Sequence, residues 1–225
     1  MKTSGRSINN VIVGIGASIA VFGSIGISSV SAQTIIEDWY KARPPVPPEL
    51  KSVAVDAKAT ALLILDFNGA QDPAKGPCNA KTKPRCLASV PKVEGLLAQA
   101  RAKGMFVVYS LGGSAAPQDI ATAIAPSAND PVVKSGPNKF VGTDLDKLLD
   151  DKGIKTVIVT GTASEGAVLD TATDAVLRKG MNVIVPVDGM SSTDLYAEQY
   201  VAWHLTHAPG VSGKVTLTKI DMIKF

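Results

Sequence analysis

An acidic and a basic side chain that could exchange protons with a substrate each follow an apolar segment of the chain. Asp66 comes directly after the apolar residues 60–65, and Lys134 follows Val132 and Val133. Burial at the end of a strand disfavours a charged carboxylate, whereas a nearby ammonium group favours it and fixes its orientation. Such a pair is suited to general acid–base catalysis. The alternatives are a structural ion pair, or an Asp66 side chain that caps the following turn.

A tight turn at residues 161–167 is the third feature with possible chemistry. An apolar strand at residues 156–160 precedes it, and a helix at residues 164–179 follows. Backbone N–H groups of such a turn could stabilise a developing oxyanion. We expect Ser164 to cap the helix rather than act as a nucleophile, because no histidine base is evident nearby. We interpret Glu165 as an acidic first-turn residue favoured by the helix dipole.

The elements that must position these residues alternate along the chain. Apolar runs predict strands at residues 60–65, 105–110, 156–160, 182–187 and 214–219. Helical segments are expected at residues 90–103, 143–150, 164–179 and 193–207, with Thr143 and Thr193 as caps. This alternation predicts a three-layer α/β/α domain with a mostly parallel, Rossmann-like sheet of about five to six strands. Ligands of such sheets bind beyond the carboxyl ends of the strands, so Asp66, Ser110 and the 161–167 turn are expected to converge.

Three segments together resemble the isochorismatase-like cysteine hydrolases. The matching segments are Leu62 to Asn68, Pro131 to Lys134 with Phe140 to Asp146, and Val157 to Ala175. The resemblance implies that Asp66 is the proton-transfer acid and Lys134 its lysine partner, and it places Ala167 at the position of the nucleophilic cysteine. It also implies the residues of the substrate pocket and oxyanion site, which are Asn68, Ser110, Ala163, Ser164 and Gly166. Asn68 stands where glutamine is usual in that family.

Ala167 decides which chemistry remains possible, because an alanine methyl group cannot attack a carbonyl carbon. Most members of the family need the thiol, but the isochorismatases proper hydrolyse a vinyl ether through the aspartate. We therefore expect a hydrolase of a small molecule that uses acid–base chemistry of Asp66 without a cysteine nucleophile. One alternative is a catalytically inactive small-molecule-binding protein on the same fold. Another is an assembly module that uses the proline-rich arm and the helix containing Trp203.

No metal and no cofactor are expected. Nicotinamidase-like relatives carry an aspartate and two histidines after the second strand, whereas residues 109–116 of this chain contain neither histidine nor acid. The two histidines, His204 and His207, are three residues apart on a predicted helix. We interpret them as surface or interface residues, because the local sequence offers no further metal ligand.

The first 32 residues have the pattern of an export signal. Lys2 and Arg6 precede the uncharged apolar residues 11–30. The segment ends at Val30-Ser31-Ala32, with small residues at the positions that a signal peptidase recognises. A retained membrane anchor is the alternative. We expect an exported protein, periplasmic or secreted, in which a proline-rich arm at residues 33–58 precedes a hydrolase domain at residues 59–225.

Cysteine content and charge restrict the environment and the partners. Cys78 and Cys86 are the two cysteines of the chain, and a short polar loop separates them, so in an oxidising compartment they are expected to form a disulfide. Without residues 1–32 the chain has 21 basic and 20 acidic residues, which argues against nucleic-acid binding. The expected partners are a small molecule and further copies of the chain, since family members often form oligomers; no membrane contact is expected after signal cleavage.

Overall fold

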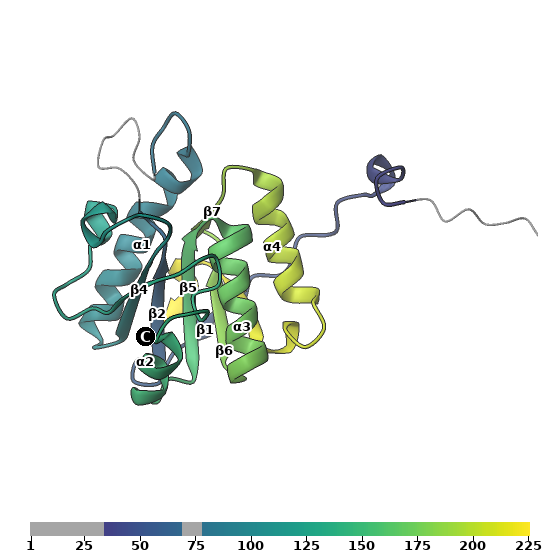
Figure 1. The fold of residues 1–225 in the computed structure, drawn as a ribbon. Coiled ribbons are helices and arrows are strands. Elements are labelled where there is room, and N and C mark those ends of the chain that lie inside the picture. Colours follow the sequence, from purple (N-terminus) through teal and green to yellow (C-terminus); the bar gives the residue numbers. More distant parts are fainter. Residues whose placement is uncertain (1–33, 69–77) are drawn as a thin grey trace, which may run out of the picture. The chain divides into compact units, whose positions relative to one another are not determined.

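The computed structural model describes residues 34–68 and 78–225 (Figure 1). The chain divides into two units, residues 1–44 and 45–225. The predicted export signal lies outside the described residues. In the described part of the first unit, one 3-10 turn, η1 (Trp39–Lys41), follows Glu37, whose carboxylate accepts a hydrogen bond from the Thr34 N–H. The second unit contains the remaining elements.

A parallel sheet of seven strands forms the centre of the second unit. Its order is β4-β3-β2-β5-β6-β8, and β7 pairs with the end of β5. The strands are β2 (Thr60–Leu65), β3 (Phe106–Leu111), β4 (Val132–Lys134), β5 (Thr156–Thr162), β6 (Asn182–Pro186), β7 (Met190–Ser191) and β8 (Val215–Thr218). The five longer strands lie where the apolar runs predicted them. The two additional strands, β4 and β7, are too short to give a sequence pattern of their own.

Helices cover both faces of this sheet, which confirms the three-layer prediction (Figure 1). Leu62 and Ile64 of β2 pack on the face covered by α1 (Pro84–Ala102). Leu63 and Leu65 pack on the opposite face, against residues of three helices. These helices are α2 (Leu145–Asp151), α3 (Leu169–Lys179) and α4 (Leu195–His207). The uninterrupted apolar sequence of β2 follows from this burial on both sides.

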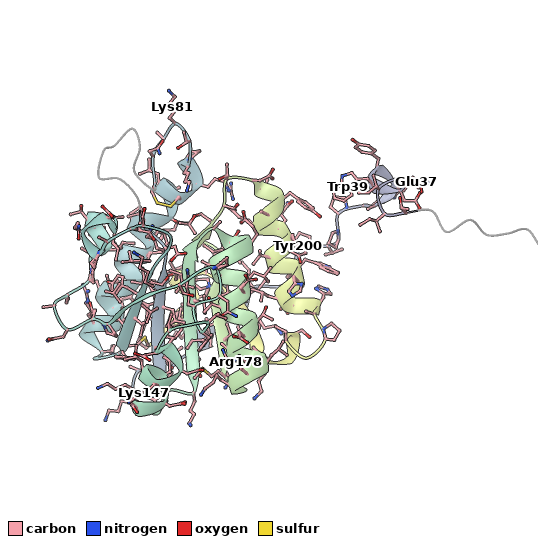
Figure 2. All side chains as sticks on the ribbon, in the orientation of Figure 1. Glu37, Trp39, Lys81, Lys147, Arg178 and Tyr200 are labelled. Carbon is pink, nitrogen blue, oxygen red and sulfur yellow. A yellow bond between two sulfur atoms is a disulfide. The ribbon has the colours of Figure 1, made fainter. Side chains whose placement is uncertain are left out.

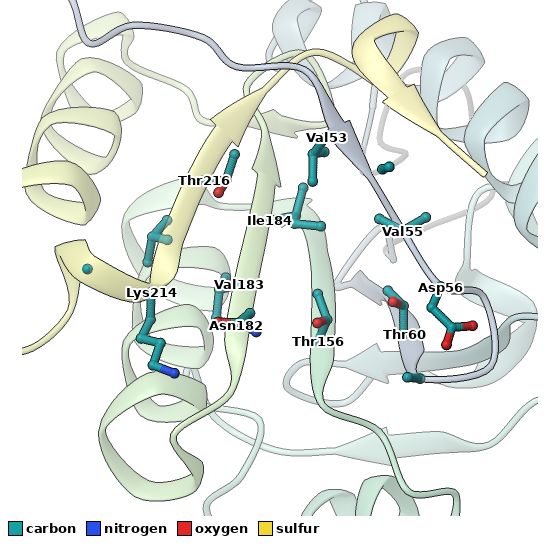
Figure 3. A pocket seen from close by; sticks show the side chains of 14 residues that line it. Val53, Val55, Asp56, Thr60, Thr156, Asn182, Val183, Ile184, Lys214 and Thr216 are labelled. Atoms are coloured by element: carbon teal, nitrogen blue, oxygen red, sulfur yellow. The ribbon is translucent and has the colours of Figure 1, made fainter.

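Two short strands form a second, two-stranded sheet beside the first one. They are β1 (Val53–Ala54) and β9 (Ile223–Lys224), which pair in parallel. Lys51 also donates a backbone hydrogen bond to the Leu217 carbonyl, so this part of the predicted arm lies on the domain. Figure 3 shows the segment of Val53 to Asp56 crossing a cavity of about 300 Å³ beside β5, β6 and β8. Asp66 and Lys139 are not among the residues that line this cavity.

All four predicted α-helices begin at other residues than expected, with the largest differences at α1 and α3. Helix α1 begins at Pro84 rather than near residue 90, because proline suits the first helical turn and Arg85 pairs with Glu198 of α4. Asp194, not Thr193, caps α4 by accepting a hydrogen bond of 2.7 Å from the Tyr196 N–H.

The structure also tests the predicted disulfide and shows whether a described helix could span a membrane. Cys78 and Cys86 form the predicted disulfide. Among residues 34–68 and 78–225, no helix combines the length and apolarity needed to cross a bilayer.

The short helices that connect these elements complete the second unit. They are η2 (Pro117–Asp119), η3 (Thr122–Ile124), η4 (Ser164–Val168), η5 (Ser212–Lys214) and η6 (Ile220–Met222). Of these, η4 directly continues into α3 and forms part of the site described next.

Candidate active site

Asp66 follows the last residue of β2 and turns out of the strand. Its φ angle is 56°, a left-handed conformation that aspartate tolerates better than most residues. Its Oδ1 accepts a hydrogen bond of 2.7 Å from the Ser110 hydroxyl on the neighbouring strand β3. The Asp66 side chain is 17% exposed, so its carboxylate is held by the protein and still reaches solvent.

Lys139 is the cation that pairs with Asp66. Its Nζ lies 2.6 Å from Asp66 Oδ2 and 2.6 Å from the Gly136 carbonyl oxygen. The Lys139 side chain is completely buried. A buried ammonium group is tolerated only when it is paired and hydrogen-bonded, and both conditions are met here.

The prediction that Lys134 is the partner of Asp66 was therefore wrong. Lys134 is the last residue of β4 and is exposed, whereas the preceding Val133 is buried. Successive side chains of a strand point to opposite faces, so a buried Val133 directs Lys134 outward. The sequence could not show this, because Val132 and Val133 are both apolar and either could have been the buried residue. Nothing in the sequence shows that the loop after β4 folds back and buries Lys139.

The end of β3 completes the surroundings of the Asp66 carboxylate. The Gly112 N–H donates a hydrogen bond of 3.2 Å to Asn68 Oδ1. A Cβ atom at Gly112 would lie 3.3 Å from Asp66 Oδ2, so glycine lets β3 pass close to the carboxylate. Asn68 and Ser110, both expected in the substrate pocket, thus lie beside Asp66.

The 161–167 turn reaches the same edge of the sheet. Leu65, the residue before Asp66, pairs with Ser110 on one side and with Gly161 on the other. After Gly161 the chain passes through a cis peptide bond between Thr162 and Ala163 into the π-helical turn η4. The expected convergence of Asp66, Ser110 and the turn follows from this register.

The turn also lies against the loop that holds Lys139. A Cβ atom at Gly166 would lie 3.6 Å from the Pro137 side chain. Ala163 is exposed, and the side chain of Ala167 is buried in the apolar cluster that includes Leu65 and Phe140. A methyl group rather than a polar atom therefore occupies the Ala167 position.

Two details of the turn differ from the expectation. The buried Ser164 does not cap a helix; its hydroxyl lies 3.3 Å from Glu165 Oε2. The Gly166 N–H donates to the Ala163 carbonyl at 3.2 Å, so this N–H is already used within the turn.

The histidines lie on α4 and contact aromatic side chains. His207 stacks on Trp203 with ring centroids 4.8 Å apart, and His204 lies against Tyr200. Figure 2 shows Tyr200 on the outer side of α4. Within the part of the chain that the structure describes, no cluster of three or more histidine, cysteine, aspartate or glutamate residues could hold a metal ion.

Comparisons with known proteins agree with this architecture. Residues 60–212 match the model of the isochorismatase domain. The streptothricin hydrolase of Streptomyces noursei is 31% identical over 147 residues, which are 61% of this chain and 51% of that enzyme. The chain thus spans about half the length of this curated relative.

Solved structures show the same fold. An isochorismatase family protein from Desulfovibrio vulgaris superposes with a TM-score of 0.60 at 22% identity, covering 72% of this chain and 95% of that one. The N-carbamoylsarcosine amidase of Thermoplasma acidophilum gives a TM-score of 0.58 at 24% identity, with 72% and 96% coverage. Since the matched domain covers more than half of the sequence, the protein belongs to the isochorismatase-like hydrolase family.

Proposed function

We propose that this protein hydrolyses a small molecule by acid–base catalysis at Asp66, with Lys139 as its ion-pair partner and without a thiolate nucleophile. The observation that carries the proposal is the Asp66 carboxylate itself. Ser110 orients one of its oxygens and the buried Lys139 ammonium the other, at the carboxyl end of a central strand. Because the strand order reverses between β2 and β5, this edge is also where α/β sheets bind ligands.

The ion pair determines the order of the proton transfers. Beside the Lys139 ammonium, Asp66 rests as a carboxylate and starts as a general base. It accepts a proton from a water molecule, whose oxygen forms a bond to the electrophilic carbon of the substrate. Asp66 then returns this proton to the leaving oxygen or nitrogen as the bond to that atom breaks. Lys139 keeps its proton throughout and stabilises the carboxylate at the beginning and end of the cycle.

A thiolate has no place in this mechanism, because the chain has two cysteines and both are in the disulfide. Because the methyl group of Ala167 cannot act as a nucleophile, a water molecule has this role in the proposed reaction. The first turn of η4 lies at the same edge, and the positive end of its helix dipole would favour negative charge that develops on the substrate.

The test is turnover by the full-length protein and its Asp66→Asn variant. The panel contains amides and ureides, together with streptothricin, which the name of the relative suggests. It also contains vinyl ethers, whose hydrolysis begins with protonation of a carbon atom and is therefore not expected when Asp66 starts as a base. We expect turnover of at least one substrate class, a loss of about 100-fold or more in Asp66→Asn, and no inhibition by iodoacetamide.

Two results would contradict the proposal. Turnover that survives in a folded Asp66→Asn protein would assign the chemistry to another group. A ligand that binds equally to both proteins and is never hydrolysed would instead favour a binding protein that has kept the fold, consistent with Ala167.

We also propose that the protein works in an oxidising compartment outside the cytoplasm. The disulfide between Cys78 and Cys86 supports this, because such bonds are rare in reducing compartments. Fractionation of cells that express the natural gene, followed by detection of the protein, tests the location. Detection in the cytoplasm alone would contradict it.

A further inference from the structure

We infer that helix α3 holds Lys139 in place, and that Thr171 and Asp174 are positioning residues of the Asp66–Lys139 pair. The expected effect of Thr171 and Asp174 on turnover rests on the proposed function. Whether α3 fixes the long, flexible Lys139 side chain beside the Asp66 carboxylate can be tested without a substrate.

Threonine hydroxyls bind both backbone polar groups of Lys139. The Lys139 N–H donates to Thr171 Oγ1 at 3.2 Å, and the Thr143 hydroxyl donates to the Lys139 carbonyl oxygen at 2.6 Å. Thr171 and Lys139 are both completely buried. Loss of the Thr171 hydroxyl would leave a buried N–H without an acceptor, which the loop can avoid only by moving.

The residue before Lys139 is fixed from the same helix. Asn138 Nδ2 donates to Asp174 Oδ2 at 2.9 Å, while Asn138 Oδ1 accepts a hydrogen bond of 3.0 Å from the Phe140 N–H. Asp174 is itself held by Arg178 at 3.1 Å. Asn138 therefore connects α3 to the backbone on the far side of Lys139.

These contacts come from one face of α3. Thr171, Asp174 and Arg178 are three and four residues apart, which is the spacing of side chains on one side of a helix. Arg178, labelled in Figure 2, also pairs with Asp146 of α2 at 3.4 Å. Residues 138–146 therefore pack on this face of α3. Helix α3 directly follows η4, the turn that contains Ala167.

The experiment compares Thr171→Val with Thr173→Val in the full-length protein. Valine keeps the shape of threonine and removes the hydroxyl. Thr173 is the matched control on the same helix, because its buried Oγ1 has no hydrogen-bond partner among the described residues. Reductive methylation followed by mass spectrometry measures how fast each lysine reacts, and the exposed Lys134 serves as the internal reference.

In the wild type we expect Lys139 to react at least about tenfold more slowly than Lys134, because modification of Lys139 requires local opening. Thr171→Val should raise the Lys139 to Lys134 ratio about fivefold or more, while Thr173→Val leaves it unchanged. Thr171→Ser, which keeps an acceptor, should restore the wild-type ratio. An unchanged ratio in a folded Thr171→Val protein would overturn the inference.

A second variant and a kinetic measurement complete the experiment. If Thr171→Val does not fold, Asp174→Ala removes the acceptor of Asn138, and the same rise in the ratio is expected; no rise would overturn the inference. With a substrate in hand, Thr171→Val should lower kcat and leave KM nearly unchanged. Absence of any turnover in the wild type would contradict the proposed function, whereas the labelling ratio would still decide the role of α3.

Discussion

At the scale of single residues, the site depends on a carboxylate whose two oxygens have different partners. Ser110 orients Asp66 Oδ1 and Lys139 neutralises the charge at Oδ2. Removing one member of a buried ion pair leaves an uncompensated charge, which costs more than the pair contributes to stability. The carboxylate and the ammonium group are therefore expected to depend on each other for folding as well as for chemistry.

Tyr109, next to Ser110 on β3, gives a prediction about alkaline pH. The pKa of Tyr109 is raised from 10.0 to about 12, mainly because burial disfavours the charged phenolate; Arg101 lowers this pKa and Asp130 raises it by smaller amounts. Because the folded state resists ionisation of Tyr109, its contribution to stability is complete below pH 10 and is lost as the pH rises towards 12. By pH 11 the loss should be about 1.4 kcal/mol.

Urea unfolding of the wild type and Tyr109→Phe at several pH values between 8 and 11 checks this. Phenylalanine does not ionise, so the stability difference between the two proteins should shrink across this range by that amount. A difference that stays constant from pH 8 to 11 would show that the Tyr109 hydroxyl is not shielded from water.

The residues of the site were only partly predictable from the sequence. Asp66 and Ser110 could be placed because each ends a long apolar strand, and strand ends of a parallel sheet meet at one edge. The identity of the lysine could not be predicted, because it depends on how the loop at residues 135–139 folds. Backbone contacts to Thr171 and Thr143 decide that fold, and neither residue has a distinctive local pattern.

At the scale of elements, close approach of β5 to the end of β2 brings the turn to Asp66. A Cβ atom at Gly161 would lie 2.7 Å from both the Leu65 carbonyl oxygen and the Leu65 Cβ atom. Backbone atoms cannot move away at little cost, so glycine at this position sets the distance between the two strands. The geometry of the turn thus depends on a residue that carries no side chain.

Gly161→Ala should therefore destabilise the protein by about 3 kcal/mol and reduce turnover. Gly95→Ala is the matched control, because Gly95 is exposed on α1 and its added Cβ would meet no atom within 4 Å. That change should stabilise the protein by about 0.5 to 1 kcal/mol through helix propensity. Thermal or urea unfolding of both variants checks the pair; equal effects would show that the strands are not in close contact at Gly161.

The sequence predicted the long elements well and the short ones poorly. Continuous apolar runs gave β2, β3 and β5, because burial on both faces requires such runs. The first turns of α1 were missed, since polar residues and Pro91 conceal a helical segment that the disulfide and the Arg85–Glu198 pair hold in place. The π-helical turn η4 was predicted as the start of an α-helix, because residues 164–168 have no sequence pattern that distinguishes the two.

At the scale of the whole molecule, cross-links between distant segments hold together the two faces of the sheet. The Arg85–Glu198 pair joins α1 to α4, and the β1–β9 pair joins the two ends of the domain. The disulfide joins Cys78, which precedes α1, to Cys86 in the first turn of α1. The fold class followed from the alternation of strands and helices, whereas two-residue strands such as β1 and β9 leave no pattern to detect.

The disulfide should contribute to global stability by restricting the unfolded chain. For a separation of eight residues the expected contribution is about 2 to 3 kcal/mol. Reduction with dithiothreitol should lower Tm by about 5 to 10 °C. The Cys78→Ala/Cys86→Ala double variant should show a similarly lowered Tm that no longer responds to the reductant; a Tm of the wild type that is insensitive to full reduction would contradict the prediction.

The most direct test of the account is kcat/KM for Lys139→Met beside Lys134→Met, with circular dichroism to confirm that both variants are folded. Both changes remove one ammonium group, but only Lys139 lies beside Asp66. We expect a loss of about 100-fold or more in Lys139→Met and wild-type activity in Lys134→Met. Full activity in a folded Lys139→Met protein would contradict the claim that the Asp66–Lys139 pair carries the chemistry.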